Sequence, residues 1–181
     1  MGKIPKINLK KQLGDEQIAL LVVPNEQYSK IIIDVAKQLA RNYKHICYVS
    51  LNKLYDPLVK SLAAKKVNLD KFFFIDCISR GVTTPTKVKN CEFLSGPQAL
   101  TEMHISISKN LKAKKSEALL FDSLSTLLVY EREVLVIRFV HGLIGAVRGV
   151  GSKAFLTVLE ADTKGELVKN LSMFTDRTIR F

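Results

Sequence analysis

Short apolar runs rich in β-branched residues alternate with segments of helical period along this chain. These runs predict strands at residues 17–23, 45–51, 72–76, 118–121, 154–159 and 177–181, with a short strand-like run at 88–93. Strands that alternate with helices indicate βαβ units, which place their strands in a mainly parallel sheet. Such a sheet is covered by helices on both faces, because its strands are apolar on both sides. The sequence therefore predicts a three-layer α/β/α fold.

Helices are predicted where apolar residues recur three or four positions apart. One helix ends near residue 42, others cover about 54–66, 131–150 and 164–173, and another opens at Ser95 or Gly96. Pro97 would then occupy a first-turn position that proline favours. Segment 131–150 is too apolar for one buried face, so we expect it to be deeply packed or to form part of a subunit contact. The irregular stretch from 77 to 97 is long enough to hold a functional loop.

Length and composition limit the class of protein. A chain of 181 residues, 47% of them hydrophobic, predicts one globular domain over residues 1–181 that includes a basic segment at 1–14. The longest apolar runs are too short to span a bilayer, and residues 1–6 lack the apolar segment of a secretory signal. We therefore expect no membrane span and a cytoplasmic location.

The cysteines do not indicate a metal site or a disulfide framework. Cys47, Cys77 and Cys91 are odd in number and lack CxxC spacing, and the chain has only 3 histidines to join them. We expect reduced thiols, two of them buried in strands, and no metal site.

The segment between the first predicted strand and helix, residues 24–31, occupies the place of a phosphate-binding loop. A loop of the form GxxxxGK[ST] uses glycines so that backbone N–H groups wrap the phosphates, a lysine to contact them and a hydroxyl to hold magnesium. Aligned on Lys30, the glycine positions hold Pro24 and Ser29, and the hydroxyl position holds Ile31. Proline has no N–H to donate, and a Cβ at either position resists the positive φ of such loops. Only the lysine remains, so these residues predict a chain that does not hydrolyse ATP.

Two residues near this segment have two interpretations each. Asp122 follows a predicted central strand, at the edge where parallel sheets bind ligands, so its carboxylate could contact a ligand. An Asp or Ser at such a position also caps the next helix, and we favour this second interpretation. Lys30 either contacts an anion at a helix N-terminus or is a solvated lysine of the first turn, and we favour the solvated lysine. Glu26 argues against a bound phosphate, because its carboxylate would repel one.

These segments together resemble a RecA/KaiC-type ATPase domain of the archaeal kind over nearly the whole chain. Residues 118–123 (ALLFDS) resemble the Walker B strand of that family, and residues 123–127 (SLSTL) resemble the continuation that follows it. The second strand of the family and the helix after it resemble residues 49–51 and the segment that follows them. The third strand of the family resembles residues 74–76. Residues 176–181 resemble its terminal D-x-x-I strand. The resemblance implies a RecA-like fold of the phosphate-loop class without a functional loop.

The departures from this resemblance concern the catalytic groups. ATPases of this family carry an acidic pair after the second strand that activates the attacking water, and here the corresponding residues are Asn52 and Lys53. The resemblance also implies an outer-sphere magnesium role for Asp122, but no partner hydroxyl completes the metal shell. The basic trans-acting group of hexameric members lies beyond the terminal strand, and we expect none here because the sequence ends at Phe181. We therefore expect a degenerate nucleotide site made of Lys30, Ser29, Asp122 and Ser123, with no catalytic residue and no ATP or magnesium cofactor.

The chain is strongly basic, with 28 Lys and Arg against 17 Asp and Glu. A field of this sign attracts polyanions such as nucleic acids. The candidate contacts are Lys3, Lys6, Lys10 and Lys11 in one cluster and Lys109, Lys112, Lys114 and Lys115 in another. Neither cluster interleaves aromatic residues, as a single-strand binder would, and lysine-rich surfaces also serve solubility.

We expect a non-catalytic RecA/KaiC-like domain that acts as a scaffold or regulatory subunit through protein–protein contacts, with itself or with an active ATPase of the same type. A nucleic-acid-binding module that uses the two lysine clusters is the alternative from a different class of function. Nucleotide binding without hydrolysis is a third interpretation.

Overall fold

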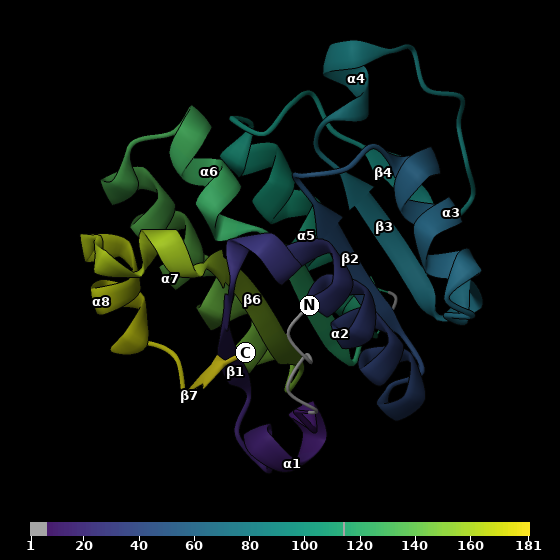
Figure 1. The fold of residues 1–181 in the computed structure, drawn as a ribbon. Coiled ribbons are helices and arrows are strands. Elements are labelled where there is room, and N and C mark those ends of the chain that lie inside the picture. The colour runs from purple at the N-terminus through teal and green to yellow at the C-terminus, as the bar shows by residue number, and fades with distance from the viewer. Residues whose placement is uncertain (1–6, 114) are drawn as a thin grey trace.

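The computed structural model describes residues 7–113 and 115–181, and a seven-stranded sheet forms its centre (Figure 1). The strands are β1 Ile18–Val23, β2 Ile46–Ser50, β3 Phe72–Asp76, β4 Cys91–Phe93, β5 Ala118–Asp122, β6 Lys153–Leu159 and β7 Arg177–Arg180. They lie in the order β4-β3-β2-β5-β6-β1-β7, and every neighbouring pair is parallel. The parallel α/β sheet that the sequence predicts is therefore confirmed.

Helices connect the strands and cover both faces of the sheet. They are α1 Leu9–Leu13, α2 Tyr28–Asn42, α3 Tyr55–Ala64, α4 Ser79–Val82, α5 Leu100–Ala113, α6 Leu124–Tyr130, α7 Glu133–Gly149 and α8 Glu166–Ser172. Short 3₁₀ turns lie at η1 Asn25–Gln27, η2 Leu69–Lys71 and η3 Glu160–Lys164. Figure 1 shows α2 in front of the sheet and α5 behind it.

Two hydrophobic clusters fill the space between the sheet and its two helical layers. Side chains alternate along β1, so that Leu20 and Val22 pack with α5, α6, α7 and α8, while Ala19 and Leu21 pack with α1, α2 and α3. Every residue of β1 is buried, which explains why this strand is an unbroken apolar run in the sequence. The three-layer arrangement follows from this burial on both faces.

The start of α5 differs from the prediction. The prediction that this helix begins at Ser95 or Gly96 is wrong, because α5 begins at Leu100. The backbone N–H of Ser95 donates to the Glu102 carboxylate at 3.0 Å, which holds the preceding chain as a turn against the helix. Pro97 therefore lies ahead of the helix and not in its first turn.

The apolar segment 131–150 forms α7, and deep packing accounts for most of it. The buried side chains of α7 are Val136, Phe139, Val140, Leu143, Ile144 and Val147. Val134 and Leu135, in its first turn, are exposed and leave an apolar surface near α6. The helix predicted at 164–173 is α8, which follows η3, and the strand-like run at 88–93 shortens to β4.

The first expectation from composition concerns the cysteines. All three cysteines are buried, Cys47 in β2 and Cys91 in β4, whereas Cys77 directly follows β3. The expectation of two buried strand cysteines is confirmed, and burial raises the pKa of the Cys91 thiol to about 12.

Among the described residues, no helix combines the length and apolar character that crossing a bilayer requires.

Candidate functional site at the carboxyl edge of the sheet

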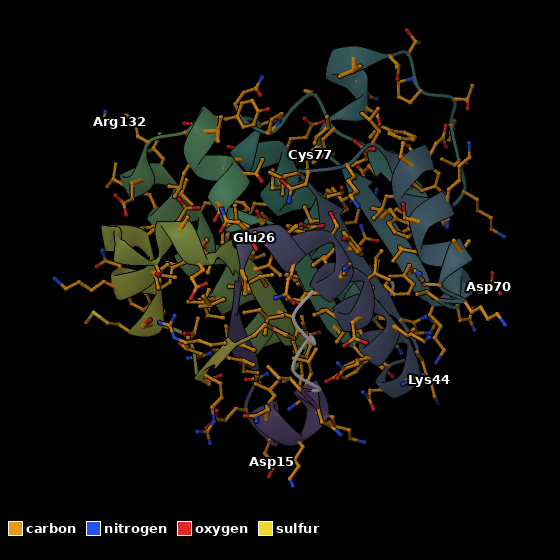
Figure 2. The ribbon with its side chains drawn as sticks, in the orientation of Figure 1. Asp15, Glu26, Lys44, Asp70, Cys77 and Arg132 are labelled. Atoms are coloured by element: carbon orange, nitrogen blue, oxygen red, sulfur yellow. The ribbon has the colours of Figure 1, made fainter. Side chains whose placement is uncertain are left out.

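The candidate site lies where β1, β2, β5 and β6 end, at the edge of the sheet from which α2 starts. Pro24 is extended, with φ −60° and ψ 134°, and its carbonyl oxygen accepts a hydrogen bond from the Gln27 N–H at 3.1 Å. The chain therefore passes from β1 to α2 through the single turn η1 and not through an open loop. Glu26 lies exposed on this turn (Figure 2).

The Asp122 carboxylate, at the end of β5, is the centre of the site and is only 1% exposed. It accepts hydrogen bonds from the Tyr48 hydroxyl at 2.6 Å, from the Asn52 side-chain amide at 2.7 Å and from the Tyr28 hydroxyl. Tyr48 belongs to the neighbouring strand β2, Asn52 lies in the loop after β2, and Tyr28 is the first residue of α2. Three separate segments therefore converge on one carboxylate.

A second ring of polar contacts holds these donors in place. The Asn52 amide oxygen accepts a hydrogen bond from the Thr126 hydroxyl of α6, and its NH₂ group also donates to the Tyr28 hydroxyl oxygen at 3.0 Å. The Thr157 hydroxyl lies 3.3 Å from the Tyr28 hydroxyl and donates to the Phe121 carbonyl oxygen at 2.9 Å. The Tyr28 phenol and the Asn52 amide thus lie against the carboxylate at the end of β5.

Burial changes the protonation equilibria of this cluster. Removal from water raises the pKa of the Asp122 carboxyl above its ordinary value, although the hydrogen bonds from Tyr28, Tyr48 and Asn52 act in the opposite direction. Burial, and after it the charge of Asp122, raises the pKa of the Tyr28 and Tyr48 hydroxyls. Both tyrosines therefore remain protonated donors at neutral pH.

The predicted helix cap at Asp122 is wrong. The cap of α6 is Ser123, whose hydroxyl oxygen accepts a hydrogen bond from the Thr126 N–H at 3.4 Å. Helix α6 packs on one face of the sheet, whereas Tyr48, which binds the Asp122 carboxylate, packs on the other. The carboxylate is directed towards the α2 side and away from the helix that it was expected to cap.

The other predicted site residues are less closely connected. Ser29 and Lys30 lie in the first turn of α2, where both are exposed, and neither takes part in the hydrogen bonds around Asp122. The exposure of Lys30 fits the interpretation as a solvated lysine. Of the predicted residues, the structure therefore joins Asp122 and Ser123 to the cluster through β5 and α6, and it leaves Ser29 and Lys30 outside it.

Sequence reasoning missed three functional partners of Asp122. Tyr48 gave a usable signal, because a tyrosine inside an otherwise apolar strand needs a partner for its hydroxyl. Asn52 was placed near the site only by the resemblance, at the position of the acidic pair, and no local pattern linked Tyr28 or Asn52 with Asp122, from which they lie 94 and 70 residues away in the sequence. Their role depends on which segments the fold brings together.

A second buried carboxylate holds the irregular stretch that follows β3. Asp76 accepts hydrogen bonds from the Ser79 hydroxyl at 2.6 Å and from the N–H groups of Tyr55 and Ser79, both at 2.7 Å. The stretch that follows forms a hollow of about 360 Å³ against α3, with Phe93 in its wall. Across the described part of the chain, no three side chains of His, Cys, Asp or Glu gather as they would around a metal ion.

The two predicted lysine clusters are described only in part. Lys3, Lys6 and Lys114 lie outside the described residues. Lys10 and Lys11 are exposed on α1, Lys109 and Lys112 are exposed on α5, and Lys115 is exposed after α5. Lys112 and Lys115 line a hollow where β5 and β6 begin, at the edge of the sheet opposite to Asp122.

We predict that Tyr28→Phe lowers the free energy of unfolding by about 1–3 kcal/mol, because it removes one donor from a buried carboxylate. Urea unfolding followed by circular dichroism measures this change. Tyr130→Phe, at an exposed tyrosine, is the matched control and should change the same free energy by less than about 0.5 kcal/mol. Equal stability of the two variants would show that the Tyr28 hydroxyl contributes nothing to the cluster.

The raised pKa of Asp122 gives a prediction for the pH dependence of stability. The folded protein binds more protons than the unfolded chain between the ordinary carboxyl pKa of about 3.9 and the raised value. The free energy of unfolding therefore falls as the pH rises through this window. We expect wild type to lose stability relative to Asp122→Asn as the pH rises above about 4, measured by urea unfolding at each pH. A relative gain over the same range would mean that the pKa is lowered instead.

The fold is similar to that of a KaiC-like protein, PH0186, from the hyperthermophilic archaeon Pyrococcus horikoshii OT3, with a TM-score of 0.66. The two sequences are 13% identical, and the similarity covers 91% of this chain and 70% of the other. At this identity the comparison shows a RecA/KaiC-like fold and nothing about activity.

The sequence matches no curated protein. Residues 48–181 match the model of a family of unknown function (DUF7504), and the chain belongs to this family.

Proposed function

We propose that this chain is a catalytically inactive domain of RecA/KaiC-like fold that acts as a scaffold or regulatory subunit through protein–protein contacts. The covered carboxylate of Asp122 carries the proposal. Its oxygens already accept hydrogen bonds from Tyr28, Tyr48 and Asn52, and it is almost completely buried. A magnesium ion with its water shell would have to displace these donors before it reached the carboxylate.

The start of α2 offers few groups to a phosphate. Pro24 has no N–H, and η1 leads directly into the helix. Ile31, at the position of the metal-binding hydroxyl, is 0% exposed and packs in the core. A triphosphate would therefore meet neither the backbone cradle nor the metal site that phosphoryl transfer uses.

The residues after β2 also argue against catalysis. Asn52 donates to Asp122 at 2.7 Å and to Tyr28 at 3.0 Å, so its amide serves the cluster that closes the site. An amide does not accept a proton from water at neutral pH, and Lys53 is a cation. These two positions therefore supply no base to activate an attacking water.

An exposed apolar surface supports the role in protein–protein contacts. Val129, at the end of α6, is 77% exposed, and Val134 and Leu135 follow it at the start of α7. A groove of about 310 Å³ between α5 and α7 continues from Leu135 to Ile105, which is 62% exposed. Contiguous apolar surface of this kind is typical of sites of protein association.

We predict that the purified chain releases no phosphate from ATP and magnesium above a heat-denatured control, because the base and the metal-binding hydroxyl are replaced. A phosphate-release assay measures the rate. Turnover that disappears in Lys30→Ala, and persists in Lys60→Ala on α3, would overturn the proposal. Lys60 is also an exposed lysine, so this control removes the same charge from a different helix.

Nucleotide binding without hydrolysis is the alternative at the same edge of the sheet. Saturating ATP with magnesium would then raise the melting temperature, because the ligand would bind the folded chain alone. A rise that Lys30→Ala abolishes would favour this alternative. We expect no rise, since Tyr28 and Asn52 cover Asp122.

We predict that the chain associates with itself through the apolar surface of α6 and α7. Leu135→Glu places a charge in that surface, and sedimentation velocity should show an increase of about tenfold or more in the dissociation constant. Val82→Glu is the matched control, because Val82 is an exposed valine on α4. A wild-type chain that remains monomeric at every concentration would contradict self-assembly and restrict the proposal to pairing with an active ATPase of the same type.

A further inference from the structure

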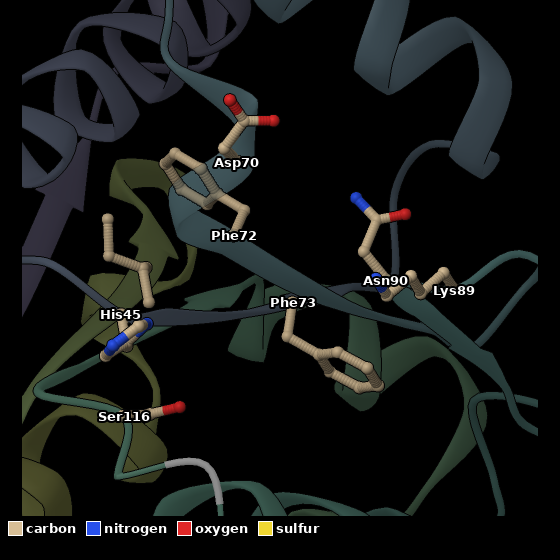
Figure 3. A pocket seen from close by; sticks show the side chains of 8 residues that line it. His45, Asp70, Phe72, Phe73, Lys89, Asn90 and Ser116 are labelled. Carbon is tan, nitrogen blue, oxygen red and sulfur yellow. The ribbon is translucent and has the colours of Figure 1, made fainter.

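Two hollows lie side by side along the amino edge of the sheet, where the strands begin. The first has a volume of about 520 Å³, and its wall includes His45, Phe73, Lys89 and Ser116. Figure 3 shows the Phe73 ring between Lys89 and Asn90 on one side and His45 and Ser116 on the other. The second has a volume of about 650 Å³, and its wall includes Tyr43, Lys112, Lys115, Ser116 and Lys153.

The two hollows adjoin at Ser116, which lines both of them, and we call the pair the trench. Backbone hydrogen bonds join the starts of the strands beneath it: the Glu117 N–H donates to the His45 carbonyl oxygen at 2.8 Å, and the Lys153 N–H donates to the Glu117 carbonyl oxygen at 3.0 Å. The wall extends from the residues before β4 to the start of β6, across β3, β2 and β5. At about 4.8 Å between neighbouring strands, the trench is about 19 Å long.

The charges along the trench are mainly positive. Its wall holds Lys89, Lys112, Lys115 and Lys153 against the carboxylates of Asp70 and Glu117. Glu117 is engaged by the Lys44 backbone N–H at 2.6 Å. Lys89, Lys112 and Lys115 are exposed, so their ammonium groups are accessible to an anionic ligand.

The basic surface continues beyond the second hollow. The Lys153 ammonium donates to the carbonyl oxygens of Gly14 at 2.9 Å and Glu16 at 2.6 Å, which places the end of α1 beside the start of β6. Lys10 and Lys11 are exposed on that helix. The described lysines Lys10 and Lys11 of one cluster and Lys112 and Lys115 of the other, about 100 residues apart in the sequence, therefore lie near the same edge of the sheet.

Aromatic side chains lie among these lysines in space although they do not in the sequence. Phe73 comes from β3 and is partly buried, Tyr43 precedes β2 and is half-buried, and the exposed imidazole of His45 lies with Phe73 in the wall of the first hollow. Basic residues that follow a phosphate backbone, combined with aromatic rings on which bases stack, are the pattern of single-strand recognition.

We infer that this trench binds single-stranded nucleic acid, with Lys89, Lys112 and Lys115 against the phosphates and Tyr43 and Phe73 against the bases. The inference goes beyond the proposed function, since it concerns the opposite edge of the sheet and needs neither ATP nor a protein partner. A trench of about 19 Å accommodates a strand of roughly four nucleotides, at the lower end of the site sizes of single-strand binders. A duplex presents its bases inside the helix and would meet the lysines alone.

Fluorescence anisotropy with fluorescein-labelled 12-nucleotide oligo-dT and oligo-rU tests this inference. We expect binding at low salt whose affinity falls as salt rises. The double variant Lys112→Gln with Lys115→Gln should weaken binding about tenfold or more and should make the log–log salt slope shallower by about 1.4, which is about 0.7 for each lost phosphate contact. The matched control is Lys60→Gln with Arg132→Gln, two exposed cations away from the trench, of which Arg132 is labelled in Figure 2.

The aromatic contribution is tested at Tyr43, whose ring also packs beside Phe155, with one variant that keeps the ring and one that removes it. Tyr43→Phe keeps the ring and should bind within about twofold of wild type, whereas Tyr43→Leu removes the stacking surface and should bind about tenfold more weakly. Thermal unfolding verifies that each variant is folded. The inference is overturned if neither oligonucleotide binds at low salt, if the trench and control variants bind equally, or if a 12-base-pair duplex binds as tightly as the single strands.

Discussion

The burial of the Asp122 carboxylate is the constraint on which the arrangement of this domain depends. A carboxylate out of water destabilises the folded state by several kcal/mol unless donors compensate it. Here the compensation comes from α2, from β2 and from the loop after β2, through Tyr28, Tyr48 and Asn52. The start of α2 must therefore pack directly over the ends of β2 and β5, and the turn η1 is short enough to bring it there.

That packing has a consequence for ligand binding. In open parallel sheets the carboxyl ends of the strands form the crevice in which ligands bind. In this chain a phenol and an amide occupy the crevice at Asp122, and the same hydrogen bonds that stabilise the fold also close it. The similarity to a KaiC-like protein at 13% identity concerns the fold alone and says nothing of the side chains at this edge. A fold of this class does not by itself determine activity.

The two edges of the sheet differ in chemical character. At the carboxyl edge, the polar groups of Asp122 and its partners bind one another, and the carboxylate is withdrawn from water. At the amino edge, exposed lysines stand beside hollows with aromatic rings in their walls. The surface over α6 and α7 is different again, because the first turn of α7 exposes apolar side chains that the core has no room to cover. The structure therefore presents three chemically distinct surfaces.

Local sequence determined the elements of this protein and their class, because helical and strand periodicity depend on residues within a few positions of one another. The runs at 72–76 and 118–121 became central strands, and the alternation of strands and helices was enough to predict a parallel sheet. The residues alone also showed that segment 24–31 lacks the glycines and the hydroxyl of the pattern GxxxxGK[ST], and that Asn52 and Lys53 are not acidic. Only the tertiary structure decided that Asp122 binds Tyr28 and Asn52 instead of capping α6, and that aromatic side chains stand among the lysines. These features depend on which strands are neighbours, above all on β2 lying beside β5, and no local pattern in the chain specifies that order.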